Sequence, residues 1–140
     1  MDDNLLLDLL TDMTRIHSNY VERRLIPLGV HSGQASIITA LGHRGTCTQK
    51  ELAQFRQVSP ATVSVMLGRM ERDNLVTREP AAVGGKANTI SLTEKGRELF
   101  ELIEASRLGD GSKLLAGFTD EDKSEAWRIF QMIAENLRNA

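Results

Sequence analysis

The sequence is poor in the residues that form cross-links and metal sites. Its one cysteine, Cys47, cannot form an internal disulfide, which agrees with a reducing compartment. No cysteine or histidine pair has the spacing of a metal-binding motif, so we interpret the histidines, His17, His31 and His43, as surface or hydrogen-bonded side chains. We therefore expect neither a metal ion nor a cofactor.

Long apolar segments and catalytic motifs are also missing. No apolar run approaches the roughly 18 residues that cross a bilayer, and residues 1–3 include two acidic side chains where a signal peptide is basic. We expect a cytoplasmic protein that has no membrane partner. No glycine-rich loop follows a predicted strand, and the acidic residues fall at helix starts and on polar surfaces, so we expect no enzymatic activity.

The charge is distributed unevenly along the chain. Of the 140 residues, 41% are hydrophobic and 26% charged, which is typical of one globular domain with an ordinary core. The net charge of −2 hides an asymmetry. Residues 48–97 contain eight basic and five acidic side chains, a balance of +3, whereas the rest contains nine and fourteen, a balance of −5. This pattern favours nucleic-acid binding at one surface of the central segment.

Two short helices separated by a tight turn are predicted between residues 48 and 73. Thr48 and Glu51 have the spacing of a capping box at the start of the first helix, and Ser59 followed by Pro60 is a typical start of the second. Few residues remain for the turn, so the two helices have to cross steeply, as in a helix-turn-helix.

The second of these helices has two different faces. Its predicted buried face consists of apolar residues at spacings of three and four, namely Val63, Met66, Leu67 and Met70. The outward residues are mostly short: Ala61, Thr62, Ser64, Val65, Gly68 and Arg69. Short side chains allow a helix to enter the DNA major groove, which is about 12 Å wide.

A small β-hairpin is predicted directly after this helix. Asn74, which tolerates a left-handed backbone, ends the helix. Residues 75–78 and 89–92 are rich in β-branched and apolar side chains, and the loop between them has Gly84 and Gly85 at its tip. The expected fold is mainly α with a small two-stranded β-wing, a winged helix-turn-helix that carries N- and C-terminal dimerisation helices.

Helices are also predicted on both sides of the winged segment. Before it, the apolar pattern predicts one helix over residues 4–27 and another over 33–43, with Ser32 as the cap of the second. After it, Thr93 and Thr119 have the sequence context of helix N-caps.

The helix that begins after Thr93 is expected to kink or break before Leu115. Gly109, Asp110 and Gly111 are poor helix formers, and each glycine costs about 1 kcal/mol relative to alanine.

The flanking helices carry more apolar residues than one small winged domain can cover. We therefore predict that they pair with those of a second copy in a two-fold dimer. The residues expected in this interface are Leu6, Leu9, Met13, Ile16, Leu114, Leu115, Phe130, Ile133 and Leu137. The predicted organisation is one compact domain, with a dimerisation helix in residues 1–31, the winged region in 32–97 and dimerisation helices in 98–140.

The candidates for DNA contact lie on the two central helices and the wing. Base-edge contacts are expected from Pro60, Ala61, Ser64 and Val65, and phosphate contacts from Thr48, Gln49, Thr62 and Arg69. The alternative is that Thr48 and Ser59 are only helix caps and that Arg69 is only a solvated charge. Arg78 is equally suited to an ion pair with a carboxylate near Glu79 and to a phosphate contact.

Taken together, these stretches resemble the multiple-antibiotic-resistance-regulator (MarR) family of winged helix-turn-helix transcriptional regulators. The resemblance covers nearly the whole chain. Four stretches carry it, in this order: QKELA at 49–53, VSPATVS at 58–64, MERDNLVTR at 70–78 and ISLTEKG at 90–96.

The resemblance implies a homodimer held by the terminal helices. It also implies a recognition helix, here residues 60–73, in the major groove of a pseudo-palindromic double-stranded DNA operator, with the wing on the adjacent backbone or minor groove. Family members usually have arginine at the wing tip, whereas this wing has one lysine, Lys86, which can contact phosphate. Many members are repressors whose DNA affinity falls when a small, often aromatic or phenolic, effector binds. Met13, Tyr20 and Trp127 are either candidates to line such an effector pocket or ordinary core residues.

Several interpretations remain open at this point. A winged domain can serve as a protein-interaction module, and a DNA-binding regulator can be insensitive to ligands. Cys47 directly precedes a helix start, where the helix dipole lowers a thiol's pKa, so it is interpreted either as a redox switch or as a small loop residue.

Overall fold

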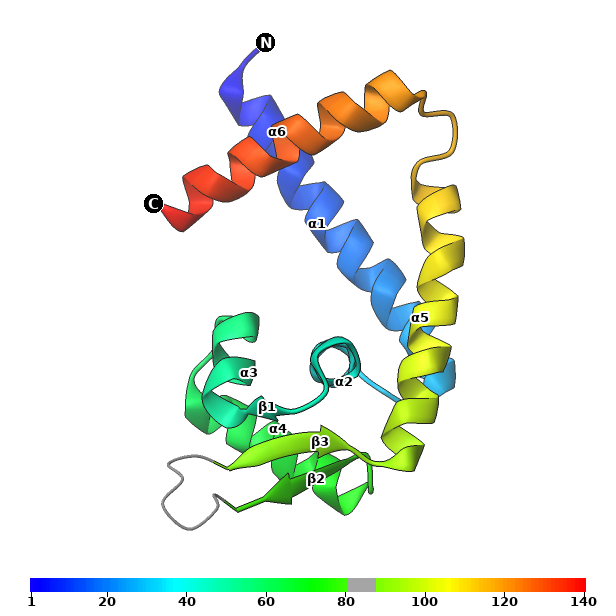
Figure 1. Ribbon diagram of the computed structural model, residues 1–140. Helices are drawn as coiled ribbons and strands as arrows, with labels where there is room; N and C mark the ends of the chain where they lie inside the picture. Colours follow the sequence, from blue (N-terminus) through cyan, green and yellow to red (C-terminus); the bar gives the residue numbers. More distant parts are fainter. Residues whose placement is uncertain (81–87) are drawn as a thin grey trace. The chain divides into compact units, whose positions relative to one another are not determined.

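The computed structural model describes residues 1–80 and 88–140, which form two compact units, Met1–Ser106 and Arg107–Ala140 (Figure 1). The elements of the first unit are α1 (Asp3–Leu25), η1 (Ile26–Leu28), α2 (Ser32–Arg44), β1 (Cys47–Thr48), α3 (Gln49–Arg56), α4 (Pro60–Arg72), β2 (Val76–Glu79) and β3 (Thr89–Leu92). α5 (Glu94–Leu114) begins in the first unit and continues into the second, which also contains α6 (Asp120–Arg138). No helix in the described ranges combines the length and the apolar character needed to cross a bilayer.

The sheet has three antiparallel strands in the order β1-β3-β2. Ile90 is at its centre, with Cys47 opposite on one side and Arg78 opposite on the other. The two strands predicted for the wing are β2 and β3, so the mainly α, winged fold is confirmed. The third strand was not predicted, because β1 is only two residues long and too short to show an alternating pattern.

The core of the first unit lies between the helices and this sheet. α2 packs on β3, and α4 packs on β2 (Figure 1). The largest fully buried side chains are Leu25, Ile37, Ile38, Leu41, Leu52, Leu67, Met70, Ile90 and Ile103. From α1 only Leu25, in the last turn, is buried, whereas the apolar faces predicted for α2 and α4 supply much of this core.

Two glycines allow backbones to approach closely in the first unit. A Cβ atom on Gly42 of α2 would lie 2.2 Å from the ring of Phe100 in α5. A Cβ atom on Gly96, in the first turn of α5, would lie 2.1 Å from the carbonyl oxygen of Leu75. The first half of α5 is therefore in contact with α2 and with the segment that follows α4.

The start of α2 differs by one residue from the prediction. His31, not Ser32, is the N-cap, and its backbone N–H donates to the Gln34 side chain at 3.2 Å. The backbone N–H of Ser32 instead donates to Glu22 of α1 at 2.9 Å. Sequence pattern alone did not locate this start, because the partner of Ser32 is ten residues away in another helix.

The expected kink or break at residues 109–111 is not seen as an interruption, since α5 is helical without a gap to Leu114. Glycine lowers helix propensity but does not block the i to i−4 hydrogen bond, and helix propagation is cooperative. One such bond joins the Leu115 N–H to the Gly111 carbonyl at 3.0 Å. The predicted cap of α6 is confirmed, because Thr119 accepts from the Asp122 N–H at 3.1 Å.

Candidate nucleic-acid interface

The start of α3 is held by the capping box that the sequence predicts. The Glu51 N–H donates to Thr48 Oγ1 at 3.1 Å, and Thr48 Oγ1 donates to Glu51 Oε1 at 3.0 Å. Thr48 is half-buried. Its hydroxyl is therefore already engaged, and its predicted phosphate contact stays a prediction.

A tight turn joins α3 to α4. Gln57 adopts a left-handed backbone with φ of 53°, and the Val58 N–H donates to the Ala53 carbonyl at 3.1 Å. A side-chain bond then fixes the two helix starts to each other, since Gln49 Nε2 donates to the Pro60 carbonyl at 3.2 Å. The two N-terminal ends are consequently held together at one surface, with backbone N–H groups suited to anions.

The cap of α4 uses two hydroxyls that contact each other. Ser59 Oγ accepts from the Thr62 N–H at 3.2 Å and lies 2.9 Å from Thr62 Oγ1. Pro60 follows as the first helical residue, where its missing N–H has no cost. The predicted cap is confirmed, and both hydroxyls have protein partners in this structure.

The two faces of α4 are separated as the sequence pattern predicts. Val63, Leu67 and Met70 are fully buried, whereas Val65 is 60% exposed. Ala61, Thr62 and Arg69 are also exposed, together with Ser59 and Pro60 at the start of the helix; Ser64 is half-buried. The first two turns of α4 thus present short side chains, and exposed charged residues follow from Arg69 onward.

Met66 departs from its predicted burial and is only half-buried. It lies toward the start of α2, where a Cβ atom on Gly33 would be 2.9 Å from Met66 Cε. Arg56 approaches the same point and donates to the Gly33 carbonyl at 3.3 Å.

The C-terminal end of α4 is tied to the wing and to α5. Asn74 has the left-handed backbone that was predicted, with φ of 57°. Thr93 Oγ1 donates to the Asn74 carbonyl at 2.6 Å, and Lys95 Nζ donates to the Asp73 carbonyl at 3.0 Å. The orientation of α4 is therefore set from both of its ends.

Arg78 of β2 forms an ion pair with Glu71 of α4, with 3.1 Å between Nη2 and Oε1. Its side chain is 24% exposed. The carboxylate that Arg78 meets is therefore on α4 and not among the neighbours of Glu79. A phosphate contact by Arg78 remains a prediction. The Arg78 guanidinium would have to contact phosphate while it is already paired with Glu71.

Comparisons with known proteins assign this architecture to a family. The model of the MarR family matches residues 28–87. The chain is 28% identical over 130 residues to the uncharacterized HTH-type transcriptional regulator YwoH of Bacillus subtilis, covering 93% of this chain and 94% of that protein. It is 28% identical over 107 residues to the HTH-type transcriptional repressor MdtR of Bacillus subtilis, covering 76% and 69% respectively. The crystal structure of the transcriptional regulator PA3341 is 29% identical, with a TM-score of 0.81, and the match covers 96% of this chain and 99% of that one.

Residues 28–87 thus match the MarR family, and the relatives that match more of the chain are transcriptional regulators. The chain is a DNA-binding transcriptional regulator with a winged-helix fold, and the interpretation that it is not an enzyme is confirmed by these relatives. The resemblance to this family makes α4 the expected recognition helix. Of the residues that the sequence nominates for DNA contact, one group is exposed, namely Ser59, Pro60, Ala61, Thr62, Val65 and Arg69. Thr48, Gln49, Ser64 and Arg78 are half-buried, and Lys86 lies outside the described residues.

Exposed charges on and near α4 have both signs. Lys50 on α3 and Arg69 and Arg72 on α4 are exposed, and so are Glu71 and Asp73. Glu71 faces Arg78, which reduces its repulsion of phosphate. The Asp73 backbone carbonyl receives Lys95, whose charge is thereby held at the end of α4.

Cys47 is not placed as a reactive thiol. It lies in β1, is 1% exposed, and pairs with Ile90. Burial raises the pKa of the Cys47 thiol, the charge of Glu51 raises it further, and Arg44 opposes both. The net direction is opposite to the expected lowering, because the buried thiolate loses hydration.

The histidines that the structure places near carboxylates belong to inter-helix contacts. His43 Nε2 lies 3.4 Å from Glu104, and its ring meets Phe100 edge-on. His31 Nδ1 lies 3.8 Å from Glu22. Within the described part of the chain, His, Cys, Asp and Glu side chains form no group of three that could hold a metal ion.

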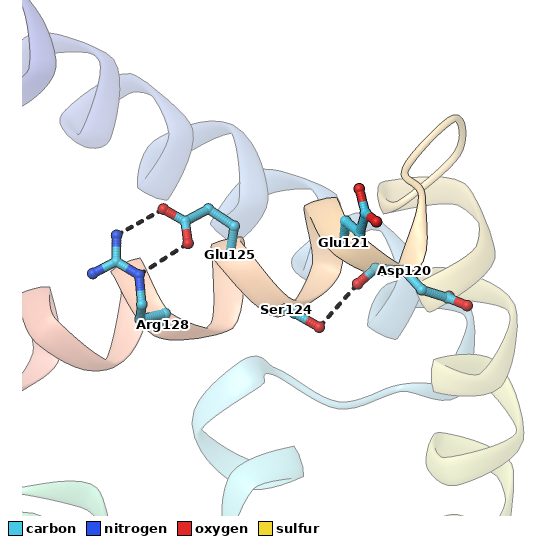
Figure 2. A pocket seen from close by; sticks show the side chains of 5 residues that line it. All are labelled: Asp120, Glu121, Ser124, Glu125 and Arg128. Atoms are coloured by element: carbon cyan, nitrogen blue, oxygen red, sulfur yellow. Dashed lines mark hydrogen bonds and ion pairs between the residues drawn. The ribbon is translucent and has the colours of Figure 1, made fainter.

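The candidate effector residues lie in both compact units. Met13 and Tyr20 are in α1, and Trp127, which is 70% exposed, is in α6. One surface hollow lies along α1 beside Ile16. Another, along α6, is shown in Figure 2, where Arg128 pairs with Glu125 at 2.7 Å and Ser124 Oγ donates to the Asp120 carbonyl at 2.9 Å. This second hollow is charged and already paired, so it does not suit an aromatic effector.

Two contacts that orient the helices of the candidate nucleic-acid interface were not predicted from the sequence. The Arg44 guanidinium of α2 lies 3.7 Å from the ring centre of Phe55 in α3, a cation–π contact. The Lys95 contact with Asp73 joins residues 22 apart. Neither has a local signal, because both depend on how separate elements pack.

Proposed function

We propose that this protein is a homodimeric MarR-family repressor. Each α4 enters the major groove of one half-site of a pseudo-palindromic double-stranded DNA operator, and the protein acts in the cytoplasm. The observation that carries this proposal is the exposed face of α4. It consists of short side chains and is held at both ends, while Val63, Leu67 and Met70 on the opposite face are fully buried. Helix-turn-helix dimers read half-sites about one helical turn apart.

The exposed apolar side chains of the terminal helices support a dimer. Large apolar side chains exposed in numbers usually mark an interaction surface. In α1, α5 and α6 the predicted interface residues Leu6, Leu9, Met13, Ile16, Leu114, Phe130 and Leu137 are 42–68% exposed, and Leu115, just after α5, is 40% exposed. Ile133 is half-buried. The occupant we propose is a second copy of the chain, through residues 1–31 and 98–140.

Repression is proposed from relatives that match this chain. MdtR of Bacillus subtilis is named as a transcriptional repressor. A bound dimer represses by occupying promoter DNA, and it needs no further chemistry to do so.

The decisive test selects bound duplexes from a random pool with the full-length protein. We expect a palindromic product, bound with an affinity that falls steeply as salt rises, because Lys and Arg displace counterions from phosphates. An unenriched pool, or binding without salt dependence, would instead favour a winged protein-interaction module.

Dimerisation is tested separately by sedimentation of a charged variant. Leu9→Glu places a carboxylate in the proposed interface, and we expect it to shift the protein toward monomer and to lower operator affinity. Thr11→Glu, at another exposed position on a different side of α1, is the matched control and should remain dimeric. Equal behaviour of the two variants, or a monomeric parent protein, contradicts the proposed interface.

A small aromatic or phenolic effector is proposed to weaken operator binding. Met13, Tyr20 and Trp127 are the candidate pocket residues. Trp127 is the only tryptophan, so its fluorescence reports ligand binding directly. A panel of aromatic acids should include one that quenches this fluorescence, raises the melting temperature with concentration and releases DNA. If no compound does so, the regulator is insensitive to this class of ligand.

A further inference from the structure

The exposed face of α4 carries aliphatic side chains and no charge where it is expected to meet base edges. Residues 60–67 contain no charged side chain. Ala61 and Val65 are one helical turn apart and therefore share a face, and Val65 is 60% exposed. Valine is a poorer helix former than alanine, and at an exposed position it gains little from packing. Helix stability therefore does not explain its presence.

The polar groups around this apolar pair have protein partners. Ser59 Oγ and Thr62 Oγ1 lie 2.9 Å apart, and Gln49 Nε2 donates to the Pro60 carbonyl. Ser64 is half-buried. Among the exposed side chains of the first two turns, Ala61 and Val65 are purely aliphatic, and they share one face.

The DNA major groove has one apolar group on its base edges, the 5-methyl group of thymine. The other three bases present hydrogen-bond donors and acceptors that an isopropyl group cannot satisfy. We propose that Val65, flanked by Ala61, determines operator sequence by packing on a thymine 5-methyl group in each half-site. This inference rests on the proposed entry of α4 into the major groove.

The test removes the methyl group from DNA and leaves base pairing unchanged. In the duplex selected by the full-length protein, each symmetry-related pair of thymines is replaced in turn by deoxyuridine, which lacks only the 5-methyl group. At one pair we expect affinity to fall by roughly fourfold per methyl group and by about fifteenfold for both half-sites. Anisotropy titrations at constant salt measure the ratio of the affinities for the thymine duplex and the deoxyuridine duplex.

Protein variants then assign the effect to a residue. In Val65→Ala the ratio between thymine and uracil duplexes should shrink to about twofold or less, because most of the contacting surface is gone. Val65→Thr keeps the shape but replaces one methyl group with a hydroxyl, and it should give an intermediate ratio. Arg69→Ala, the matched control on the same helix, should weaken both duplexes alike.

The outcomes separate this inference from the proposed function. If no duplex is selected, the proposed DNA reading itself fails. If a selected operator binds tightly but no thymine responds to loss of its methyl group, DNA binding stands and the readout by Val65 is wrong. An undiminished ratio in Val65→Ala would assign the methyl contact to another residue and also overturn the inference.

Discussion

The side-chain amide of Gln49 donates to the backbone carbonyl of Pro60 across 3.2 Å, and so joins the starts of α3 and α4. In the proposed complex both helices approach DNA with these ends. We expect Gln49→Ala to weaken operator binding severalfold, since a hydrogen bond of this kind contributes about 0.5–1.5 kcal/mol. Glutamine is neutral, so the slope of affinity against salt should not change. Anisotropy titrations at several salt concentrations measure both quantities, and Gln54→Ala, exposed on the same helix, is the control. Equal affinities for the two variants would show that the bond has no positioning role.

Substitutions on the two faces of α4 should have different effects on the stability of the fold. Leu67 is fully buried, and Leu67→Ala should lower the free energy of unfolding by about 2–5 kcal/mol through the cavity that it leaves. Val65→Ala, on the exposed face, should change it by about 0.5 kcal/mol or less. Chemical denaturation of the two variants tests this contrast. A Val65→Ala loss as large as that of Leu67→Ala would mean that this face is covered.

Gly96 should be intolerant of a side chain, although it lies in a helix. A Cβ atom there would lie 2.1 Å from the Leu75 carbonyl oxygen, which belongs to the backbone. We expect Gly96→Ala to destabilise the fold and to disturb the end of α4 that Thr93 and Lys95 hold.

Gly68 provides the matched comparison for Gly96. A Cβ atom on Gly68 would meet no atom within 4 Å among the described residues, and the position is inside α4. Gly68→Ala should therefore stabilise the protein by about 0.5–1 kcal/mol. Thermal melting should show a lower melting temperature for Gly96→Ala and a higher one for Gly68→Ala. Changes in the same direction for both variants would contradict this packing.

Acidification should weaken the junction of α1 and α2. Hydrogen bonds from Ser32, together with the nearby charge of His31, hold the pKa of Glu22 below its ordinary value of 4.5. A carboxylate whose pKa is lower in the folded state stabilises the fold above its unfolded pKa, and this contribution is lost as the pH falls through the folded pKa.

The corresponding experiment compares the pH dependence of melting. Glu22→Gln can still accept from the Ser32 N–H but does not titrate, so its melting temperature should fall less than that of the parent protein between about pH 6 and pH 3. Glu98→Gln, exposed on α5, should follow the parent protein. If both variants follow it, the Glu22 contact has no measurable effect on stability.

Much of the winged region could be predicted because its signals are local. The Thr48 and Glu51 capping box, the Ser59 cap and the left-handed Asn74 each depend on neighbours within a few residues. The buried positions Val63, Leu67 and Met70 follow from helical periodicity alone. Such features form from short-range bonds and sterics, so they can be recognised before any packing is known.

Features that failed or were missed depend on distant partners. His31 rather than Ser32 caps α2 because the Ser32 N–H meets Glu22 of another helix. Cys47 is buried because a two-residue strand pairs it with Ile90, and that burial reverses the expected direction of its pKa.

The sequence by itself determined the helix-turn-helix, the wing strands and the short-chained face of α4, since each follows from caps, periodicity and residue size. Only the tertiary structure decided what surrounds that face. It joined Gln49 to Pro60, paired Arg78 with Glu71, and left Val65 projecting. The physical reason is that hydrogen bonds and ion pairs between side chains require atoms to lie within a few ångströms, and for pairs far apart in sequence only the packing of α2, α4, α5 and the sheet brings them there.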